Sequence, residues 1–154
     1  MKKFAVILGA MMIGTCFCLS TVLADVYIIE NGKDNVPNVI NKGPFPMADV
    51  PKSGEEKNTG FKFGTAHAMI GSVKIHYGTL EPNGYIGTHA GPDVYTCIIT
   101  KGSGIYGNTT PDGKKTSEIS FKAGDLLVVR PNAFHYWKGG NELIELYVIE
   151  QAQP

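Results

Sequence analysis

The sequence predicts an all-β fold, on the evidence of its composition and of the spacing of its apolar runs. It has 154 residues, of which 43% are hydrophobic and 18% charged, as in ordinary globular domains. Nineteen glycines and nine prolines favour many short strands joined by turns over long helices. Fourteen basic residues balance fourteen acidic ones, so charge gives no reason to expect nucleic acid or an anionic membrane as a partner.

Residues 1–24 have the layout of a bacterial secretory signal peptide. Lys2 and Lys3 give a positive start, residues 4–22 are largely apolar, and residues 22–24 form a cleavage site of small and apolar residues. An uncleaved membrane anchor and a lipoprotein are the alternatives, but polar and glycine residues dilute the apolar stretch, and the nearest cysteine box, residues 13–16, lies in its middle. We therefore expect cleavage after Ala24, a periplasmic or secreted protein, and no membrane contact after cleavage.

The chain that follows divides into two parts. Residues 25–60 are rich in Asn, Pro, Gly and Lys, with one strand expected at residues 26–29, and are interpreted as an irregular N-terminal arm lying on the domain. Residues 61–154 form the domain itself. Cys97 is the only cysteine left after residue 24, so it has no partner within the exported chain.

From residue 61 onward, short runs of β-branched and aromatic residues alternate with turn signals, the pattern of a sandwich or barrel. Each break contains glycine, usually with Asn, Asp or Pro, which supply the backbone angles of tight turns. The breaks are residues 81–84, 101–104, 110–113, 122–124 and 138–141. The strands expected between them are residues 61–69, 72–80, 85–89, 94–100, 104–107, 116–121, 125–129, 134–137 and 143–150.

Two segments, residues 80–102 and 124–137, resemble the two signature motifs of the cupin superfamily. His89 matches the first histidine of the first motif and Gly102 its closing glycine. Gly124 opens the second motif, and His135 follows it by the eleven residues that the family uses. The resemblance covers residues 61–150 and implies a double-stranded β-helix, or jelly-roll barrel, with His89 and His135 converging inside it.

The same resemblance implies a degenerate metal site. In typical cupins three histidines and a glutamate hold a transition metal, but Gly91 stands at the second histidine and Tyr95 at the glutamate. Two imidazoles leave most coordination positions to water or ligand, and a phenol with a pKa of about 10 is a poor substitute. We expect a weakly held divalent ion (Zn, Fe, Mn, Ni or Cu) on His89 and His135, or no cofactor.

Strand alternation identifies further candidates. Side chains two residues apart share a face, so an inward Tyr95 would bring Cys97 inward with it. Cys97 is then either a third metal ligand, in a site suited to Cu or Zn, or a small apolar filler.

Four more residues are candidates for ligand binding. Trp137 shares a strand face with His135, and Tyr85 offers another aromatic surface, although such residues serve equally in cores or interfaces. Arg130 is a carboxylate clamp or a solvated strand end. His76 enters the barrel or lies at its mouth.

Two main functions remain open at this point. One is an exported barrel that binds a small polar or carbohydrate-like ligand. The other is an enzyme, either a metal-dependent dioxygenase, lyase or isomerase, or a metal-free isomerase with His89 or His135 as base and Tyr95 as acid. A structural scaffold is a third possibility. By resemblance we also expect a homodimer.

Overall fold

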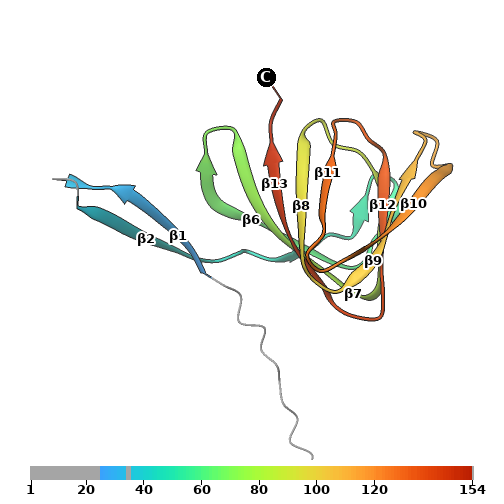
Figure 1. Cartoon of the computed structure of the whole chain (residues 1–154), viewed down its shortest axis with the longest axis horizontal. Helices are drawn as coiled ribbons and strands as arrows, with labels where there is room; N and C mark the ends of the chain where they lie inside the picture. Colours follow the sequence, from blue (N-terminus) through green and yellow to red (C-terminus); the bar gives the residue numbers. More distant parts are fainter. Residues whose placement is uncertain (1–24, 34–35, 154) are drawn as a thin grey trace, which may run out of the picture.

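The computed structural model describes residues 25–33 and 36–153, and most of them lie in strands (Figure 1). The expected signal segment, with Cys16 and Cys18, falls outside the described residues. Within the described part of the chain, no helix is long and apolar enough to span a bilayer. The all-β prediction is confirmed, and the strands follow the apolar runs of the sequence closely.

The strands of the barrel are β6 (Thr59–Ile70), β7 (Val73–His89), β8 (Val94–Lys101), β9 (Ser103–Thr109), β10 (Lys115–Lys122), β11 (Leu126–Val129), β12 (His135–Gly139) and β13 (Ile144–Gln151). Neighbouring strands pair antiparallel in the order β10-β9-β12-β7-β13-β8-β11, and β6 joins the far side of β7. Figure 1 shows this sheet curling around so that its inner face encloses the barrel interior.

Strand β7 carries the chain from one wall of the barrel to the next. Its first half pairs with β13, where Leu80 lies opposite Ile144, and its second half pairs with β12, where Ile86 lies opposite Trp137. The expected break at residues 81–84 is therefore wrong as a strand end. The turn residues instead produce a bend within one strand, at which Asn83 takes a positive φ of 58°.

The core fills one end of the barrel. Along β13, β8 and the first half of β7, alternate side chains point inward, and Ile144, Ile99 and Leu80 are each about 1% exposed. Phe121 closes this region by packing edge-to-face on Trp137 at 5.1 Å between ring centroids. Residues further toward the start of β8 and the end of β13 line a cavity instead of a filled core.

The N-terminal arm contains more paired strands than the sequence indicated. Strand β1 (Asp25–Asn31) confirms the expected strand, but β2 (Pro37–Pro44) pairs with it to make a hairpin that stands away from the barrel (Figure 1). Sequence reasoning missed β2 because proline, asparagine and glycine have low strand propensity. Short strands β3 (Ala48–Asp49), β4 (Lys52–Ser53) and β5 (Glu56–Lys57) then lead to β6.

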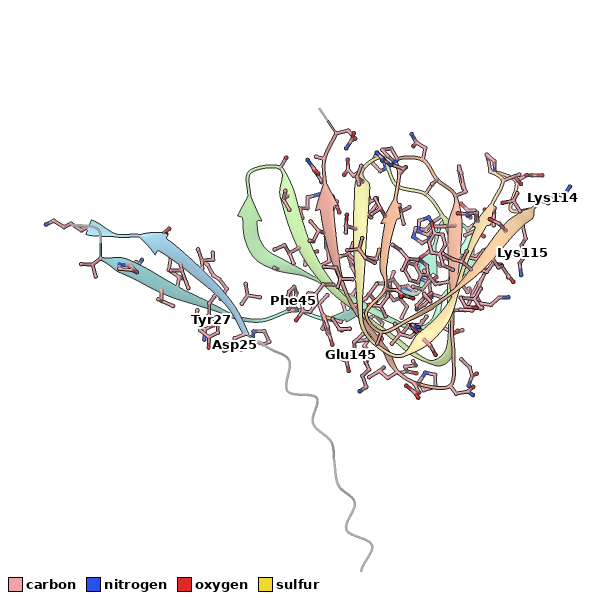
Figure 2. All side chains as sticks on the ribbon, in the orientation of Figure 1. Asp25, Tyr27, Phe45, Lys114, Lys115 and Glu145 are labelled. Carbon is pink, nitrogen blue, oxygen red and sulfur yellow. The ribbon has the colours of Figure 1, made fainter. Side chains whose placement is uncertain are left out.

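Phe45 fixes the arm to the outer surface of the barrel. Figure 2 shows it where the hairpin joins the barrel strands, and it is 8% exposed. Its ring packs at 5.7 Å on Tyr77 and 6.0 Å on Tyr147, which are direct cross-strand neighbours on β7 and β13. This aromatic contact joins the arm to the strands that hold the cavity.

Candidate functional site

A cavity of about 300 Å³ lies inside the barrel, toward the end where β8 begins and β13 ends. Its walls are mainly apolar and aromatic, with a small number of polar groups, as in sites for small molecules. The lining residues are Val50, Phe61, Phe63, Ile86, His89, Ala90, Gly91, Tyr95, Cys97, Val129, His135, Trp137, Leu146, Val148 and Glu150.

His89 and His135 meet in this cavity because they are direct partners in the ladder between β7 and β12. Directly opposite residues of an antiparallel pair project their side chains on the same face, only a few ångströms apart. The two ring centroids are 4.3 Å apart, with the rings inclined at 53°. The predicted convergence of the two histidines is confirmed.

Each imidazole is held by a backbone carbonyl two residues before it. Nδ1 of His89 lies 2.8 Å from the carbonyl oxygen of Gly87, and Nδ1 of His135 lies 2.8 Å from that of Ala133. A carbonyl oxygen can only accept, so both rings donate from Nδ1–H and keep a lone pair on Nε2. Among the described residues neither Nε2 has a hydrogen-bond partner, and Thr109 Oγ1 is the one fully buried side-chain oxygen or nitrogen left unpaired. Both Nε2 atoms therefore remain accessible in the cavity.

Burial keeps both imidazoles neutral at physiological pH. Burial first, and then the neighbouring His89, lower the pKa of His135 to about 4. Burial also lowers the pKa of His89, although its bond to Gly87 acts in the opposite direction. The site thus presents two uncharged acceptors side by side.

Tyr106 fixes the aromatic side of the site. It lies opposite Trp137 in the pairing of β9 with β12 and packs edge-to-face on it at 5.1 Å. The same ring stacks on His135 at 5.2 Å, with an interplanar angle of 19°. Sequence reasoning placed Trp137 on the cavity face, as observed, but missed Tyr106, because Ile105 and Tyr106 are adjacent and apolar and alternation does not tell which of them faces inward.

Tyr95 occupies the space above Gly91. A Cβ built on Gly91 would collide with the Tyr95 hydroxyl and ring, lying 2.6 Å from Cε2. The backbone N–H of Asn132 donates to the carbonyl of Gly91 at 2.8 Å, which holds this segment against the turn after β11. Gly91 and Tyr95 therefore depend on each other, because the phenol fills the space that a side chain at residue 91 would need.

Three expected ligand-binding residues lie outside the cavity lining. Tyr85 points away from it and donates to Glu56 at 2.6 Å, and Arg130 is exposed at the end of β11. His76 is buried but does not line the cavity; its imidazole contacts Glu150, which does. Glu150 itself was missed, although Leu146, Val148 and Glu150 share one face of β13 and alternation predicts it inward.

Solved structures match the fold of this chain, whereas comparisons of sequence give no match. No protein-family model and no curated protein matches the chain. The cupin domain of Cnp3 from Schizosaccharomyces pombe superimposes with a TM-score of 0.59 at 10% identity, over 84% of this chain and 88% of that one. A cupin 2 conserved barrel protein from Rhodopseudomonas palustris gives 0.58 at 14% identity, over 71% and 72%.

The fold is a cupin barrel. A variant of oxalate decarboxylase from Bacillus subtilis also matches, with a TM-score of 0.52 at 13% identity, over 64% of this chain and 28% of the enzyme. At such identities the likeness concerns the barrel alone, and cupin barrels support unrelated activities. Function has to be argued from the residues in the cavity.

The residues present do not fit a tightly held cupin metal. Two Nε2 atoms are available, but within the described residues no three or more His, Cys, Asp or Glu side chains are close enough to share an ion. Cys97, a candidate third ligand or apolar filler, lines the cavity but is 4% exposed, and burial raises the pKa of its thiol to about 12. A protonated thiol is a poor ligand, so its role as an apolar filler explains its position better.

Acidification should weaken the folded state through His135. Its folded pKa of about 4 lies below the ordinary value near 6.5, so the unfolded chain binds the proton first as pH falls. The contribution of His135 to the free energy of unfolding is fully present well above pH 6.5. It should fall by about 1.5 kcal/mol between pH 6.5 and 5. Urea unfolding at several pH values, with chelator present, measures the slope.

The His135→Gln variant should lose that part of the pH slope. Ile86→Val is the matched control, because Ile86 lines the same wall and carries no titratable group. It should lower stability by about 1 kcal/mol at every pH and keep the wild-type slope. An unchanged slope in His135→Gln would contradict the burial of a neutral imidazole.

Placing a histidine at residue 91 and a glutamate at residue 95, where the resemblance to cupins implies metal ligands, should create a metal site. The double variant Gly91→His/Tyr95→Glu removes the phenol that blocks residue 91 and supplies an imidazole and a carboxylate beside His89 and His135. Calorimetric titration with Zn²⁺ should show affinity at least about 100-fold above the wild type. Gly91→Ala/Tyr95→Ala opens similar space without ligands and should show no gain. A wild type that already holds zinc against chelator would contradict this account.

Proposed function

We propose that this chain is an exported binding protein that holds a small polar ligand, carbohydrate-like in its hydroxyl groups, inside the cupin barrel. The observation that carries the proposal is the pair of neutral imidazoles, whose Nε2 atoms are accessible acceptors in a mainly apolar cavity. Acceptors without partners are costly in such surroundings, so the site favours a molecule that brings donors to them.

The walls of the cavity suit a compact ring or chain. Phe61, Phe63, Tyr95 and Trp137 contribute aromatic surface, and the volume of about 300 Å³ lies in the range of small-ligand pockets. The backbone carbonyls that hold both rings preorganise the acceptors, so little ordering is needed when a ligand arrives.

An acid/base enzyme is less well supported by the same residues. Burial lowers the pKa of His135 to about 4, and burial with the nearby Glu150 and Asp93 raises the pKa of Tyr95. General acid/base catalysis is most effective when the pKa lies near the working pH, and here both groups move away from it. A weak base and a weaker acid fit ligand binding better than proton transfer.

The proposed binding of a small ligand does not require a metal ion. A divalent transition ion could reach the two Nε2 atoms, but water would have to supply the remaining ligands, so we expect weak binding that a chelator reverses. Ligand binding should therefore persist in chelator. Export through residues 1–24 and assembly into a homodimer remain part of the proposal, as the sequence suggested.

The single tryptophan provides the test. Trp137 lines the cavity and is the only tryptophan in the chain, so its fluorescence reports occupancy directly. Glucose, xylose, myo-inositol and trans-1,4-cyclohexanediol should be titrated in the presence of chelator. We expect a saturable change with at least one of them, and a loss of affinity of about tenfold in His89→Ala and in His135→Ala, since each removes an acceptor.

Arg130→Ala is the control, because Arg130 is exposed and lies outside the cavity lining. It should bind the same probe with unchanged affinity. If no probe gives a saturable change, or if the two histidine variants bind as well as the wild type, the proposed function is wrong.

A further inference from the structure

The cavity contains one carboxylate, Glu150, which the histidine pair does not explain. It lies at the end of β13 and lines the cavity with its side chain 12% exposed. Its presence bears on which small polar ligand the site takes, an inference that rests on the proposed function. Two neutral acceptors alone would suit hydroxyl groups, but a carboxylate adds a negative charge to the recognition surface.

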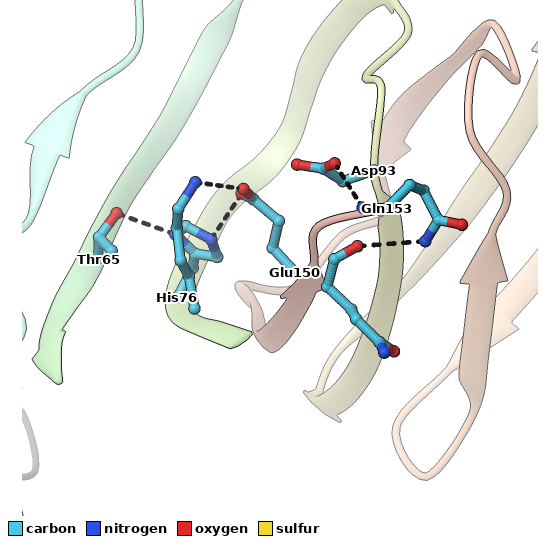
Figure 3. A network of polar contacts seen from close by, with 7 residues as sticks. Thr65, His76, Asp93, Glu150 and Gln153 are labelled. Atoms are coloured by element: carbon cyan, nitrogen blue, oxygen red, sulfur yellow. Dashed lines mark hydrogen bonds and ion pairs between the residues drawn. The ribbon is translucent and has the colours of Figure 1, made fainter. Parts of the chain in front are cut away.

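Glu150 is held in place by two residues from β7 (Figure 3). Nζ of Lys74 lies 2.5 Å from Oε1, and Nε2 of His76 lies 3.0 Å from Oε2. Although burial acts to raise it, the pKa of Glu150 is lowered by Lys74 and His76, so the carboxylate is ionised. A carboxylate offers about four lone-pair positions, and these two bonds leave capacity for a ligand donor.

His76 contributes no charge to this end of the cavity. Its Nδ1 lies 2.9 Å from the hydroxyl of Thr65, on the side away from Glu150 (Figure 3). The ionised carboxylate requires a donor at Nε2, so the ring accepts from Thr65 at Nδ1. Its ring stacks on Phe63 at 4.8 Å, and burial lowers its pKa despite Glu150. His76 is therefore a neutral support for the carboxylate.

A second carboxylate lies near the Lys74–Glu150 ion pair. Glu150 first, and then Asp93, raise the pKa of Lys74, and Figure 3 shows Asp93 beside the same cluster. Glu150 is the carboxylate that is ion-paired with Lys74, and Lys74 is 42% exposed, where solvent weakens its hold. Among the described residues that line the cavity there is no lysine or arginine. Carboxylate and phosphate ligands would find no countercharge in this lining.

The aromatic walls of the cavity also favour a positively charged ligand. Aromatic faces attract cations through their quadrupole, and Phe61, Phe63, Tyr95 and Trp137 share the cavity with Glu150. We propose that the ligand is a small organic cation with N–H donors, an amine or amidine, whose charged nitrogen is held by Glu150 and whose other donors reach Nε2 of His89 and His135. Glu150 and the two Nε2 atoms then each have a complementary partner.

Three matched probes test this proposal. Trans-4-aminocyclohexanol, trans-1,4-cyclohexanediol and trans-4-hydroxycyclohexanecarboxylate share one ring and one hydroxyl, and differ in carrying an ammonium, a hydroxyl or a carboxylate. Trp137 fluorescence should be titrated with each, using the exported chain at neutral pH and low salt. We expect the amine to bind at least about tenfold more tightly than the diol, and the carboxylate to bind more weakly than either.

Two variants with opposite expected effects identify Glu150 as the anchor. Glu150→Gln should bring the ratio of amine to diol affinity close to one. Lys74→Gln removes the competing ammonium from Glu150 and should raise amine affinity about threefold, a gain that a merely structural role would not produce. Lys74 is half-exposed, so this variant keeps the test decisive even if Glu150→Gln fails to fold.

The outcomes separate this inference from the proposed function. If the diol or a sugar binds as tightly as the amine, the cation inference is overturned and the binding function stands. If the amine binds no better in Lys74→Gln than in the wild type, Glu150 is not its anchor and the inference is overturned. If the amine binds but neither the diol nor any sugar does, the carbohydrate-like character in the proposed function is wrong and the cation inference stands. If no probe binds, both are overturned.

Discussion

The pairing of β7 with β12 is the constraint on which the cavity depends, because it makes His89 and His135 direct cross-strand neighbours. A slip of one residue along either strand would turn one imidazole to the opposite face. The pairing also determines the ring orientations, since each Nδ1 reaches the carbonyl two residues before it. Backbone geometry therefore selects the tautomer, and the tautomer leaves both Nε2 atoms available to a ligand.

A second consequence follows from what surrounds that pair. The Tyr95 ring packs into the space that a side chain at residue 91 would need, which fills part of the cavity and adds apolar wall. With Cys97 protonated by burial, the two imidazoles have no third His, Cys, Asp or Glu among the described residues close enough to share a firmly held ion. The cavity of this cupin barrel therefore offers hydrogen bonding and aromatic contact to a ligand.

The sequence predicted most of the strands, the barrel, and the meeting of His89 with His135, because alternation and turn residues are local signals and the two motifs fix the spacing. It did not predict that residues 81–84 bend one strand, since turn residues look alike in a turn and in a bulge. Tyr85 and Arg130 were placed with the cavity, but the structure turns Tyr85 to Glu56 and leaves Arg130 exposed. Such positions depend on long-range pairing, which composition does not reveal.

Glu150 is the opposite case, because the sequence does contain a signal for its position that was missed. It follows Leu146 and Val148 on the inward face of β13, so alternation alone would have placed it in the cavity. A charged residue at a strand end is usually taken to be solvated, and only the contacts with His76 and Lys74 show that Glu150 is partly buried and held in place. The two motifs that predicted the fold therefore did not predict the negative charge in the cavity.

The most direct test of the site's geometry is the tautomeric state of His89, His135 and His76. It is read from long-range ¹H–¹⁵N correlation spectra of the folded chain at neutral pH in chelator. The account predicts that His89 and His135 are neutral with the proton on Nδ1, and that His76 is neutral with the proton on Nε2. A proton on Nε2 of His89 or His135, or a charged imidazolium at either position, would contradict it.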